Sequence, residues 1–410
     1  MQTKKNIFLW TSYDFANSII SITFFLYFAQ WIVIDKGIPD LFYNLVFTIS
    51  AILLFFTVPL TGVLLDKSLR RIAGLRITTI TTFVLLVTCA LFTISDRPIL
   101  ALIAYTAGFY SYLLTFTFYT PLLNDIASEN KRGKISGYGI SANYLGQVAG
   151  LLIALPFATG ALSIFGSNTR AETLLPAVIM FLLFSLPMLI FFKEPKKAPL
   201  KFLIKDELKN TIKEVKSLLL VPSVGLFLLA FFLFNDAILT SANNFSIFLE
   251  QVWHVSDTIK TFILLGILVT SAIGGTLGGI IADKVGHKRT LMFILLGWVI
   301  ILPLVGLLTN FALFVVVTTI MGFWFGANWA VSRSVMAYLA PSGKHNLAFG
   351  FYGLAERASS VLGPVIWGLV VGGLVSMGSV RYKIALVSVT IFIILGLIVF
   401  SRVRSDRARV

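Results

Sequence analysis

The sequence contains very few cysteine, histidine and charged residues. Its 410 residues include one cysteine, Cys89, and three histidines, His254, His287 and His345. A single cysteine excludes an internal disulfide framework and any multi-cysteine metal site. The histidines all fall at or between the ends of apolar runs, which excludes a histidine-based metal site or proton relay inside a membrane. We therefore expect no cofactor and no metal.

Charged residues make up only 12% of the chain and hydrophobic residues 57%, whereas soluble domains use about 25% charged residues. This composition predicts a membrane protein. The formal net charge of +15 would suggest a nucleic-acid partner for a soluble chain. Here the cations cluster beside apolar runs, where they are better explained by orientation in the bilayer. We expect no nucleic-acid partner.

Twelve apolar runs are long enough to span a bilayer as helices, which takes about 20 residues. They alternate with polar loops, so the predicted fold class is an all-α membrane protein with twelve transmembrane helices in two six-helix bundles. The predicted spans are Ile7–Ile34, Leu41–Leu65, Ala73–Ile94, Pro98–Leu122, Ile135–Phe157, Leu174–Phe192, Leu219–Phe248, Thr258–Ala282, Thr290–Leu308, Phe311–Tyr338, Leu347–Gly372 and Tyr382–Phe400.

The first run is too long for the core of a signal peptide, about 7 to 15 residues, and we expect it to stay in the mature protein. Orientation follows from the cations in alternate loops. One set of loops holds 25 of the 33 Lys and Arg residues and the opposite set holds 6. The positive-inside rule therefore predicts that both termini are cytoplasmic.

A short basic turn occurs twice in the sequence. Gly279 to Arg289 contains a glycine, an acid, a turn glycine and a closing cation pair, and Gly62 to Arg71 repeats all but the turn glycine. A fold of two related halves produces such a repeat. The pattern resembles the cytoplasmic signature loop of the major facilitator superfamily, which implies a role in cytoplasmic gating. The residues that this resemblance points to are Asp66, Arg70, Arg71, Asp283, Lys288 and Arg289.

The only long polar interval divides the chain into two halves. We predict an N-terminal six-helix bundle over residues 1–192, a cytoplasmic amphipathic linker over 193–218 and a C-terminal six-helix bundle over 219–410. Within the linker, apolar residues recur at helical spacing among lysines. This pattern favours a helix on the anionic inner leaflet, and a partner-binding or lipid-sensing site is the alternative.

Glycine is concentrated on the fifth, eighth and eleventh runs. Gly146 with Gly150, and Gly275 with Gly279, have the GxxxG spacing that lets two helices pack closely. In the major facilitator superfamily, these three helices belong to the set along which the halves slide.

Two aspartates lie deep in matching spans of the two halves. Asp14 is about ten residues into the first span and Asp236 about 17 residues into the seventh, in places where a charge is costly. Polar neighbours surround both, among them Tyr13, Asn17 and Asn235. Such clusters are expected to line an aqueous cavity or a helix contact. One reading makes the two carboxyl groups proton carriers, and the other makes each an acceptor of hydrogen bonds from a neighbouring helix.

A second charged group lies nearer the cytoplasmic ends of the spans. Arg333 is in the tenth span, and Glu356 and Arg357 are in the eleventh. We expect these residues to pair with one another and with Asp283 in a network that closes the cytoplasmic side, in preference to contacting a substrate. Asp125 is expected to pair in the same way with Arg70 or Arg71.

Two further pairs of polar or aromatic side chains lie one helical turn apart. Trp324 and Asn328 are on the tenth span, and Asn143 and Gln147 are on the fifth. Residues at this spacing share one face of a helix. We include all four among the candidate cavity residues, although an interfacial aromatic belt is an alternative explanation for the tryptophan.

Four motifs narrow the resemblance. They are Tyr13-Asp14-Phe-Ala-Asn17-Ser18, Phe234-Asn235-Asp236, Ser332-Arg333-Ser334, and the stretch from Phe349 to Pro364. Together they resemble the vacuole-effluxer, or autophagy-related amino-acid effluxer, family of the major facilitators. This resemblance implies export of amino acids as the activity of relatives.

The sequence thus predicts a secondary transporter that moves a small polar solute, such as an amino acid or related metabolite, by alternating access and with proton coupling. We predict no enzyme activity. The alternatives are an intramembrane aspartyl protease, which would need two carboxylates sharing one water, and a transport-inactive sensor or scaffold. No phosphate-binding G-x-x-x-x-G-K-[ST] loop is present, which disfavours an ATP-driven pump. The expected partners are the solute, protons and the lipid bilayer, without an obligatory protein partner, and the expected location is a bacterial-type inner membrane.

Overall fold

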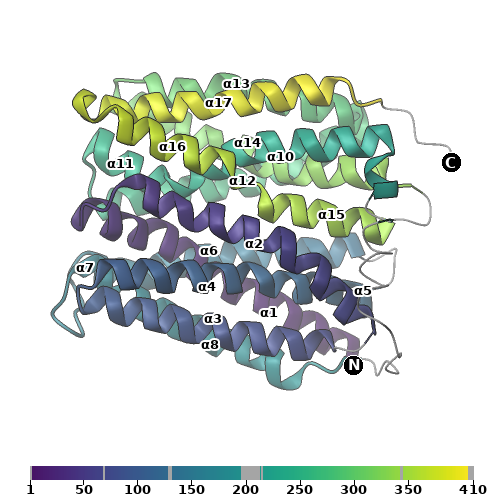
Figure 1. Ribbon diagram of the computed structural model, residues 1–410, viewed down its shortest axis with the longest axis horizontal. Coiled ribbons are helices and arrows are strands. Elements are labelled where there is room, and N and C mark those ends of the chain that lie inside the picture. The colour runs from purple at the N-terminus through teal and green to yellow at the C-terminus, as the bar shows by residue number, and fades with distance from the viewer. Residues whose placement is uncertain are drawn as a thin grey trace. The chain divides into compact units, whose positions relative to one another are not determined.

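The computed structural model describes residues 2–67, 70–127, 132–194, 213, 216–341 and 345–404, and within these ranges it contains helices and no strands. Twelve of its helical segments have the length and hydropathy of membrane spans. The prediction of twelve transmembrane helices is therefore confirmed. The ribbon in Figure 1 shows these long helices. Most of the predicted linker lies outside the described residues.

The helices form two compact units of contacts. Unit 1 comprises Met1–Ile38 and Phe56–Leu208, and unit 2 comprises Pro39–Phe55 and Lys209–Val410. The division differs from the predicted halves at one segment, because the first part of helix α2, Asp40–Lys67, has its contacts within unit 2.

In unit 1 the remaining helical elements are α1 Gln2–Thr23, η1 Phe24–Phe28, η2 Trp31–Asp35, α3 Arg71–Ile94, α4 Pro98–Tyr119, η3 Thr120–Leu122, α5 Leu123–Ile126, α6 Arg132–Ala158, α7 Thr169–Glu172 and α8 Leu174–Phe191. In unit 2 they are α10 Pro222–Asn243, α11 Phe245–Trp253, α12 Asp257–Val285, α13 His287–Leu307, α14 Phe311–Leu339, α15 His345–Ala358, α16 Leu362–Gly373, η5 Val375–Met377 and α17 Val380–Ser401.

The eleventh span is broken into two helices, which Figure 1 shows as the separate coils α15 and α16. The break covers Ser359 to Val361, just before Gly363 and Pro364. Proline has no N–H, and its ring clashes with the carbonyl of the residue four positions earlier. The first turn of a helix tolerates this, so the chain stops one helix and starts another there. The predicted span Leu347–Gly372 missed this break.

The first span ends in two π-helical stretches, η1 and η2. The predicted Ile7–Ile34 span treats this region as regular helix. Such stretches are rare and often occur near functional sites. Here η1 places Phe24 parallel to Tyr105 of α4, with ring centroids 5.2 Å apart.

Glycines allow two helix pairs to approach closely. In unit 1, a Cβ built on Gly146 of α6 would lie 2.2 Å from the Phe15 carbonyl oxygen of α1. In unit 2, Gly274 and Gly278 of α12 face α14 in the same manner. The predicted Gly275 and Gly279 pair is on the same helix, but Gly279 has nothing within 4 Å. The close contact of α12 with α14 is therefore made by Gly274 and Gly278, the GxxxG pair one position earlier.

The turn between α12 and α13 requires a glycine. Gly286 has φ of 103°, a conformation that residues with a Cβ rarely adopt. It ends α12 and begins α13, which explains the turn glycine in the second copy of the repeated motif.

Candidate functional site

Asp236 holds the start of α16. Its Oδ2 accepts hydrogen bonds from the backbone N–H groups of Leu362 at 3.0 Å and Gly363 at 2.9 Å. The first N–H groups of a helix have no partner within the helix, and a carboxylate there satisfies them and is favoured by the helix dipole. The Asp236 side chain is fully buried, and its Oδ1 has no hydrogen-bond partner among the described residues. In this structure Asp236 is therefore an acceptor for a neighbouring helix.

The close approach of α10 and α16 depends on Gly363. A Cβ at this position would lie 2.3 Å from Thr240 Oγ1 and 3.1 Å from Asp236 Oδ1. Only a residue without a side chain lets the start of α16 reach the carboxylate.

Asp14 has a different environment in unit 1. It is partly exposed, and its carboxyl lies beside the hydroxyl of Tyr119. Trp10 stacks on Tyr119 with ring centroids 4.9 Å apart. A Cβ on Gly139 of α6 would lie 3.0 Å from Asp14 Oδ2 and 2.7 Å from the Trp10 ring, so Gly139 keeps this side of the carboxylate clear.

The hydroxyls of Tyr13 and Tyr119 are fixed by hydrogen bonds. Tyr13 is fully buried, and its hydroxyl lies 2.6 Å from Thr79 Oγ1 of α3. The Tyr119 hydroxyl donates to the Trp10 carbonyl oxygen at 2.9 Å, and the Trp10 indole donates to the Tyr119 carbonyl oxygen. This reciprocal pair joins α1 to the end of α4, and it holds two aromatic rings next to Asp14.

Asn17 lies one turn after Asp14 on α1. It is fully buried, and neither its amide nitrogen nor its amide oxygen has a hydrogen-bond partner among the described residues. A buried amide without partners is costly unless a water or ligand satisfies it. On α6, Gln147 donates to Asn143 Oδ1 at 2.8 Å, which confirms that this pair shares a face.

Asn235 connects α10 to α15. Its amide nitrogen donates to the Glu356 carbonyl oxygen at 3.2 Å, while its buried Oδ1 has no described partner. The Glu356 carboxylate pairs with the Arg333 guanidinium of α14 at 3.5 Å. The predicted pairing of Arg333 with Glu356 is therefore present. Arg357 instead donates to the carbonyl oxygen of Gly353 on its own helix.

The two candidate residues of the tenth span have different surroundings. Trp324 packs on α13, because a Cβ on Gly297 would overlap its indole nitrogen at 1.6 Å. Asn328 is fully buried, and both of its amide atoms lack a partner among the described residues. Ser332, one turn later, is also fully buried with an unpartnered hydroxyl in the described part of the chain.

The predicted gating residues of unit 1 include a small ionic cluster. Arg71 Nη1 lies 2.8 Å from Asp125 Oδ2, as predicted. Glu194 accepts from the backbone N–H groups of Arg71 and Ile72, both at 3.1 Å, and so caps α3. This cap was missed, because 122 residues separate Glu194 from Ile72. Arg70 is exposed, and the side chain of Asp66 lies outside the described residues.

The second copy of the repeated motif makes fewer contacts. Lys288 donates to the carbonyl oxygen of Ser401 at 3.0 Å, and Arg289 is exposed. Asp283 is also exposed. The ion pairs between described residues do not include Asp283, so its predicted pairing with Arg333 or Arg357 is absent from this structure.

The first part of α2 carries a polar stripe that was not predicted. Asp40, Asn44 and Thr48 are spaced four residues apart, so they share one face, and all three are buried. Asp40 accepts from the Tyr382 hydroxyl at 3.1 Å. Asn44 and Asn244 exchange two amide hydrogen bonds, of 2.9 and 2.8 Å. The regular spacing was a signal in the sequence, but nothing in it identified the partners.

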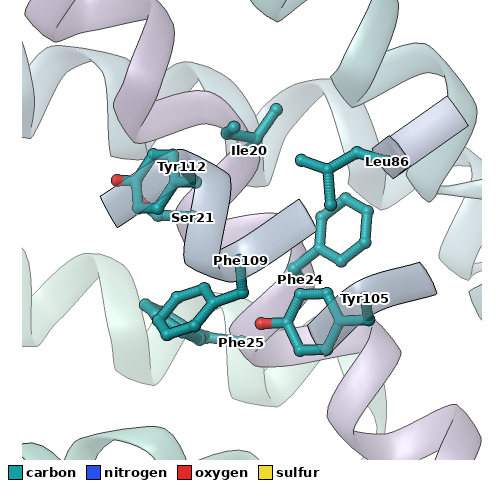
Figure 2. A pocket seen from close by; sticks show the side chains of 8 residues that line it. All are labelled: Ile20, Ser21, Phe24, Phe25, Leu86, Tyr105, Phe109 and Tyr112. Atoms are coloured by element: carbon teal, nitrogen blue, oxygen red, sulfur yellow. The ribbon is translucent and has the colours of Figure 1, made fainter. Parts of the chain in front are cut away.

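An aromatic hollow lies next to η1 in unit 1. Figure 2 shows Phe24 beside Tyr105 and Phe25 beside Phe109, with Leu86 and Ser21 on the lining. Its volume of about 10 Å³ has room for at most about one water molecule. It is therefore a packing gap between rings in this structure.

The described residues contain no cluster of three or more His, Cys, Asp or Glu side chains that could hold a metal ion. The two aspartates belong to separate units, and each is built into its own set of contacts.

Comparison with known proteins identifies the family. The pattern of the family described as "Vacuole effluxer Atg22 like" matches residues 42–410. A protein called Autophagy-related protein 22 from Candida glabrata is 29% identical over 205 residues, which is 46% of this chain and 35% of that protein. Its counterpart from Saccharomyces cerevisiae is 28% identical over 37% of this chain and 30% of that protein. The aligned part thus spans about a third of these yeast proteins.

A bacterial relative aligns over more of its length. An uncharacterised protein of Aquifex aeolicus is 26% identical over 85% of this chain and 84% of that protein. Among solved structures, the nucleoside transporter NupG has a TM-score of 0.73 at 13% identity, covering 98% of this chain and 99% of that one. An inward-facing, unoccupied bacterial homologue of the human lysosomal transporter Spinster has a TM-score of 0.71 at 13% identity, covering 97% and 95%.

These neighbours are transporters of the major facilitator superfamily and not enzymes. At such low identity they establish the fold alone. The family match covers most of the sequence and includes the stretches that carry Asp236, Arg333 and Glu356. The chain belongs to the vacuole effluxer Atg22-like family and has the major facilitator fold.

Proposed function

We propose that the protein is a proton-coupled secondary transporter of a small polar solute, such as an amino acid or related metabolite. The description of the family as a vacuole effluxer and the transporter fold of the solved neighbours support transport as the activity. The observation that carries the proposal is Asp14, a partly exposed carboxyl group inside a membrane span, next to a fully buried amide, Asn17, that lacks partners among the described residues. Groups of this kind are costly in a membrane, and ligand or ion binding offsets that cost.

Asp14 and Asp236 are the proposed proton carriers. A carboxyl group in a partly dry cavity exchanges a proton when the cavity opens to one side or the other. The proposed substrate-cavity residues are Tyr13, Asn17, Asn143, Gln147, Asn235, Trp324 and Asn328. The pairs Arg71 with Asp125 and Arg333 with Glu356 are proposed as cytoplasmic gate contacts, because such pairs can form and break at little net cost.

We further propose that both termini are cytoplasmic and that the protein resides in a bacterial-type inner membrane without an obligatory protein partner. The excess of cations in one set of loops supports this orientation.

The Asp14→Asn variant tests the coupling role in unit 1. Asparagine keeps the size of the side chain but cannot carry a proton, so solute-dependent proton uptake is expected to fall to the level of protein-free vesicles. The measurement uses proteoliposomes that contain the pH dye pyranine, with an equimolar mixture of the common amino acids as the added solute.

The matched control for this variant is Asp96→Asn. The Asp96 side chain is 66% exposed and pairs with Lys36. Its φ of 56° is one that asparagine also tolerates. Proton uptake of the control is expected to equal that of the wild type. Full uptake by the Asp14→Asn variant would remove Asp14 from the coupling mechanism.

A further inference from the structure

One peptide group at the break between α15 and α16 joins two other helices. The carbonyl oxygen of Val361 accepts a hydrogen bond from Thr48 Oγ1 of α2 at 3.3 Å. The N–H of the same peptide belongs to Leu362 and donates to Asp236 Oδ2 of α10 at 3.0 Å. All of these residues belong to unit 2. A continuous chain of hydrogen bonds thus runs from Thr48 through the peptide to Asp236.

This peptide is available because the helix is broken there. In an unbroken helix, the Leu362 N–H and the Val361 carbonyl oxygen would each bond along the helix. Hydrogen bonds in series polarise one another, most of all where water is excluded. Thr48 is 7% exposed and Asp236 is 0% exposed. A donor on the Val361 carbonyl therefore makes the Leu362 N–H a stronger donor to the carboxylate.

The carboxyl group of Asp236 receives hydrogen bonds only from the backbone in the described residues. The charged and titratable side chains that are described on the elements packed against α10 have other partners. On α15, Glu356 pairs with Arg333 of α14, Arg357 bonds to Gly353, and the Tyr352 ring packs on Phe231. On α11, Glu250 forms an ion pair with Lys260. On α17, the Tyr382 hydroxyl donates a hydrogen bond to Asp40, and Lys383 donates one to the carbonyl oxygen of Leu308. The remaining charged group of α17, Arg381, lies over the Tyr382 ring, and α16 carries no titratable side chain.

We infer that Thr48 is a positioning residue that acts on Asp236 through the Val361–Leu362 peptide. It thereby links the protonation of Asp236 to the contact between α2 and the start of α16. This inference rests on the proposed coupling role of Asp236. A protonated carboxyl accepts the Leu362 N–H more weakly than a carboxylate does. The Val361 carbonyl then becomes a weaker acceptor, and its hydrogen bond from Thr48 weakens.

The other contacts on this face of α2 are also polar, so a change in one hydrogen bond can affect whether the whole contact opens. Asp40 and Asn44 hold the same face of α2 through Tyr382 and Asn244. Polar groups in such a contact can exchange their partners for water when the contact opens, so separation costs little per bond. A small change in the strength of the Thr48 hydrogen bond can therefore shift the equilibrium between the closed and the open contact of α2.

The test compares Thr48→Val, which removes the hydroxyl, with Thr48→Ser, which restores it. Proton uptake driven by the amino-acid mixture is measured as a function of pH. Loss of the hydroxyl weakens the Leu362 donor and leaves the carboxylate less stabilised. The midpoint of the profile is therefore expected to move to higher pH by about 0.3 pH unit, and Thr48→Ser is expected to return it. The control is Thr276→Val, because the Thr276 hydroxyl bonds to Ala272 of its own helix.

A second measurement does not depend on the solute. Hydrogen–deuterium exchange in detergent follows the amides of Leu362 and Gly363. Exchange is expected to be about fivefold faster in Thr48→Val than in the wild type and unchanged in Thr276→Val. This readout remains valid if the valine variant transports poorly.

The outcomes separate this inference from the proposed function. If Asp236→Asn loses pH dependence but Thr48→Val matches the wild type in both profile and exchange, the role of Thr48 is refuted and the coupling role of Asp236 stands. If Asp236→Asn keeps the wild-type pH dependence, the coupling role itself is wrong and the inference fails with it.

Discussion

Replacing Asp236 with leucine is expected to abolish proton-coupled uptake and to destabilise the protein. Leucine leaves the N–H groups of Leu362 and Gly363 without the acceptor that binds them at 3.0 and 2.9 Å. Each unpaired buried donor costs about 1–3 kcal/mol, so the free energy of unfolding should fall by about 2–6 kcal/mol. Thermal unfolding in detergent, monitored by size-exclusion chromatography, measures this loss of stability.

Asp236→Asn separates the structural role from the coupling role. Asparagine caps helices about as well as aspartate, so the variant should stay within about 1 kcal/mol of the wild type while losing solute-dependent proton uptake. Asp96→Asn is again the control, with both properties unchanged. Equal stability of the leucine and wild-type proteins would show that the carboxylate is not needed to hold α16.

Gly326→Val is expected to prevent α12 and α14 from packing. A Cβ at Gly326 would lie 1.8 Å from the Ser271 carbonyl oxygen and 2.6 Å from its carbonyl carbon. Because these are backbone atoms, no side-chain rotation can relieve the overlap, and the helices must separate. The cost is expected to be about 3 kcal/mol or more. It would appear as a lower unfolding temperature, or as aggregation, in detergent.

Gly279→Val provides the comparison on the facing helix, since a Cβ at Gly279 meets nothing within 4 Å. Its unfolding temperature should stay close to that of the wild type. If both valine variants were equally stable, close packing of α12 on α14 would not be what requires glycine at position 326.

The spans could be predicted because the bilayer imposes one simple requirement, a long apolar helix. The predicted span Pro98–Leu122 has the bounds found in the structure. The break before α16 was missed, although Gly363 and Pro364 were visible as its signal. Despite Glu356, Arg357 and the two serines at the break, Ala348–Gly373 keeps the length and hydropathy of a single span. Hydropathy alone does not detect a change of backbone direction inside the membrane.

The contacts of the candidate residues were harder to predict than their positions. Asp236 stood out as a charge in an apolar run, but its partners are 126 and 127 residues away in sequence. The pairing of Arg71 with Asp125 could be proposed because both lie at helix ends on the same side of the predicted membrane. A sequence does not show which backbone N–H groups a distant side chain binds, so the caps made by Asp236 and Glu194 could not be predicted from it.

The reciprocal amide pair of Asn44 and Asn244 limits how the two positions can diverge among relatives. Each amide both donates to and accepts from the other, so changing one alone leaves a buried donor and a buried acceptor unmatched. A paired replacement by two apolar residues would avoid that penalty. Natural variation at positions 44 and 244 should therefore be correlated, with mixed polar and apolar combinations rare.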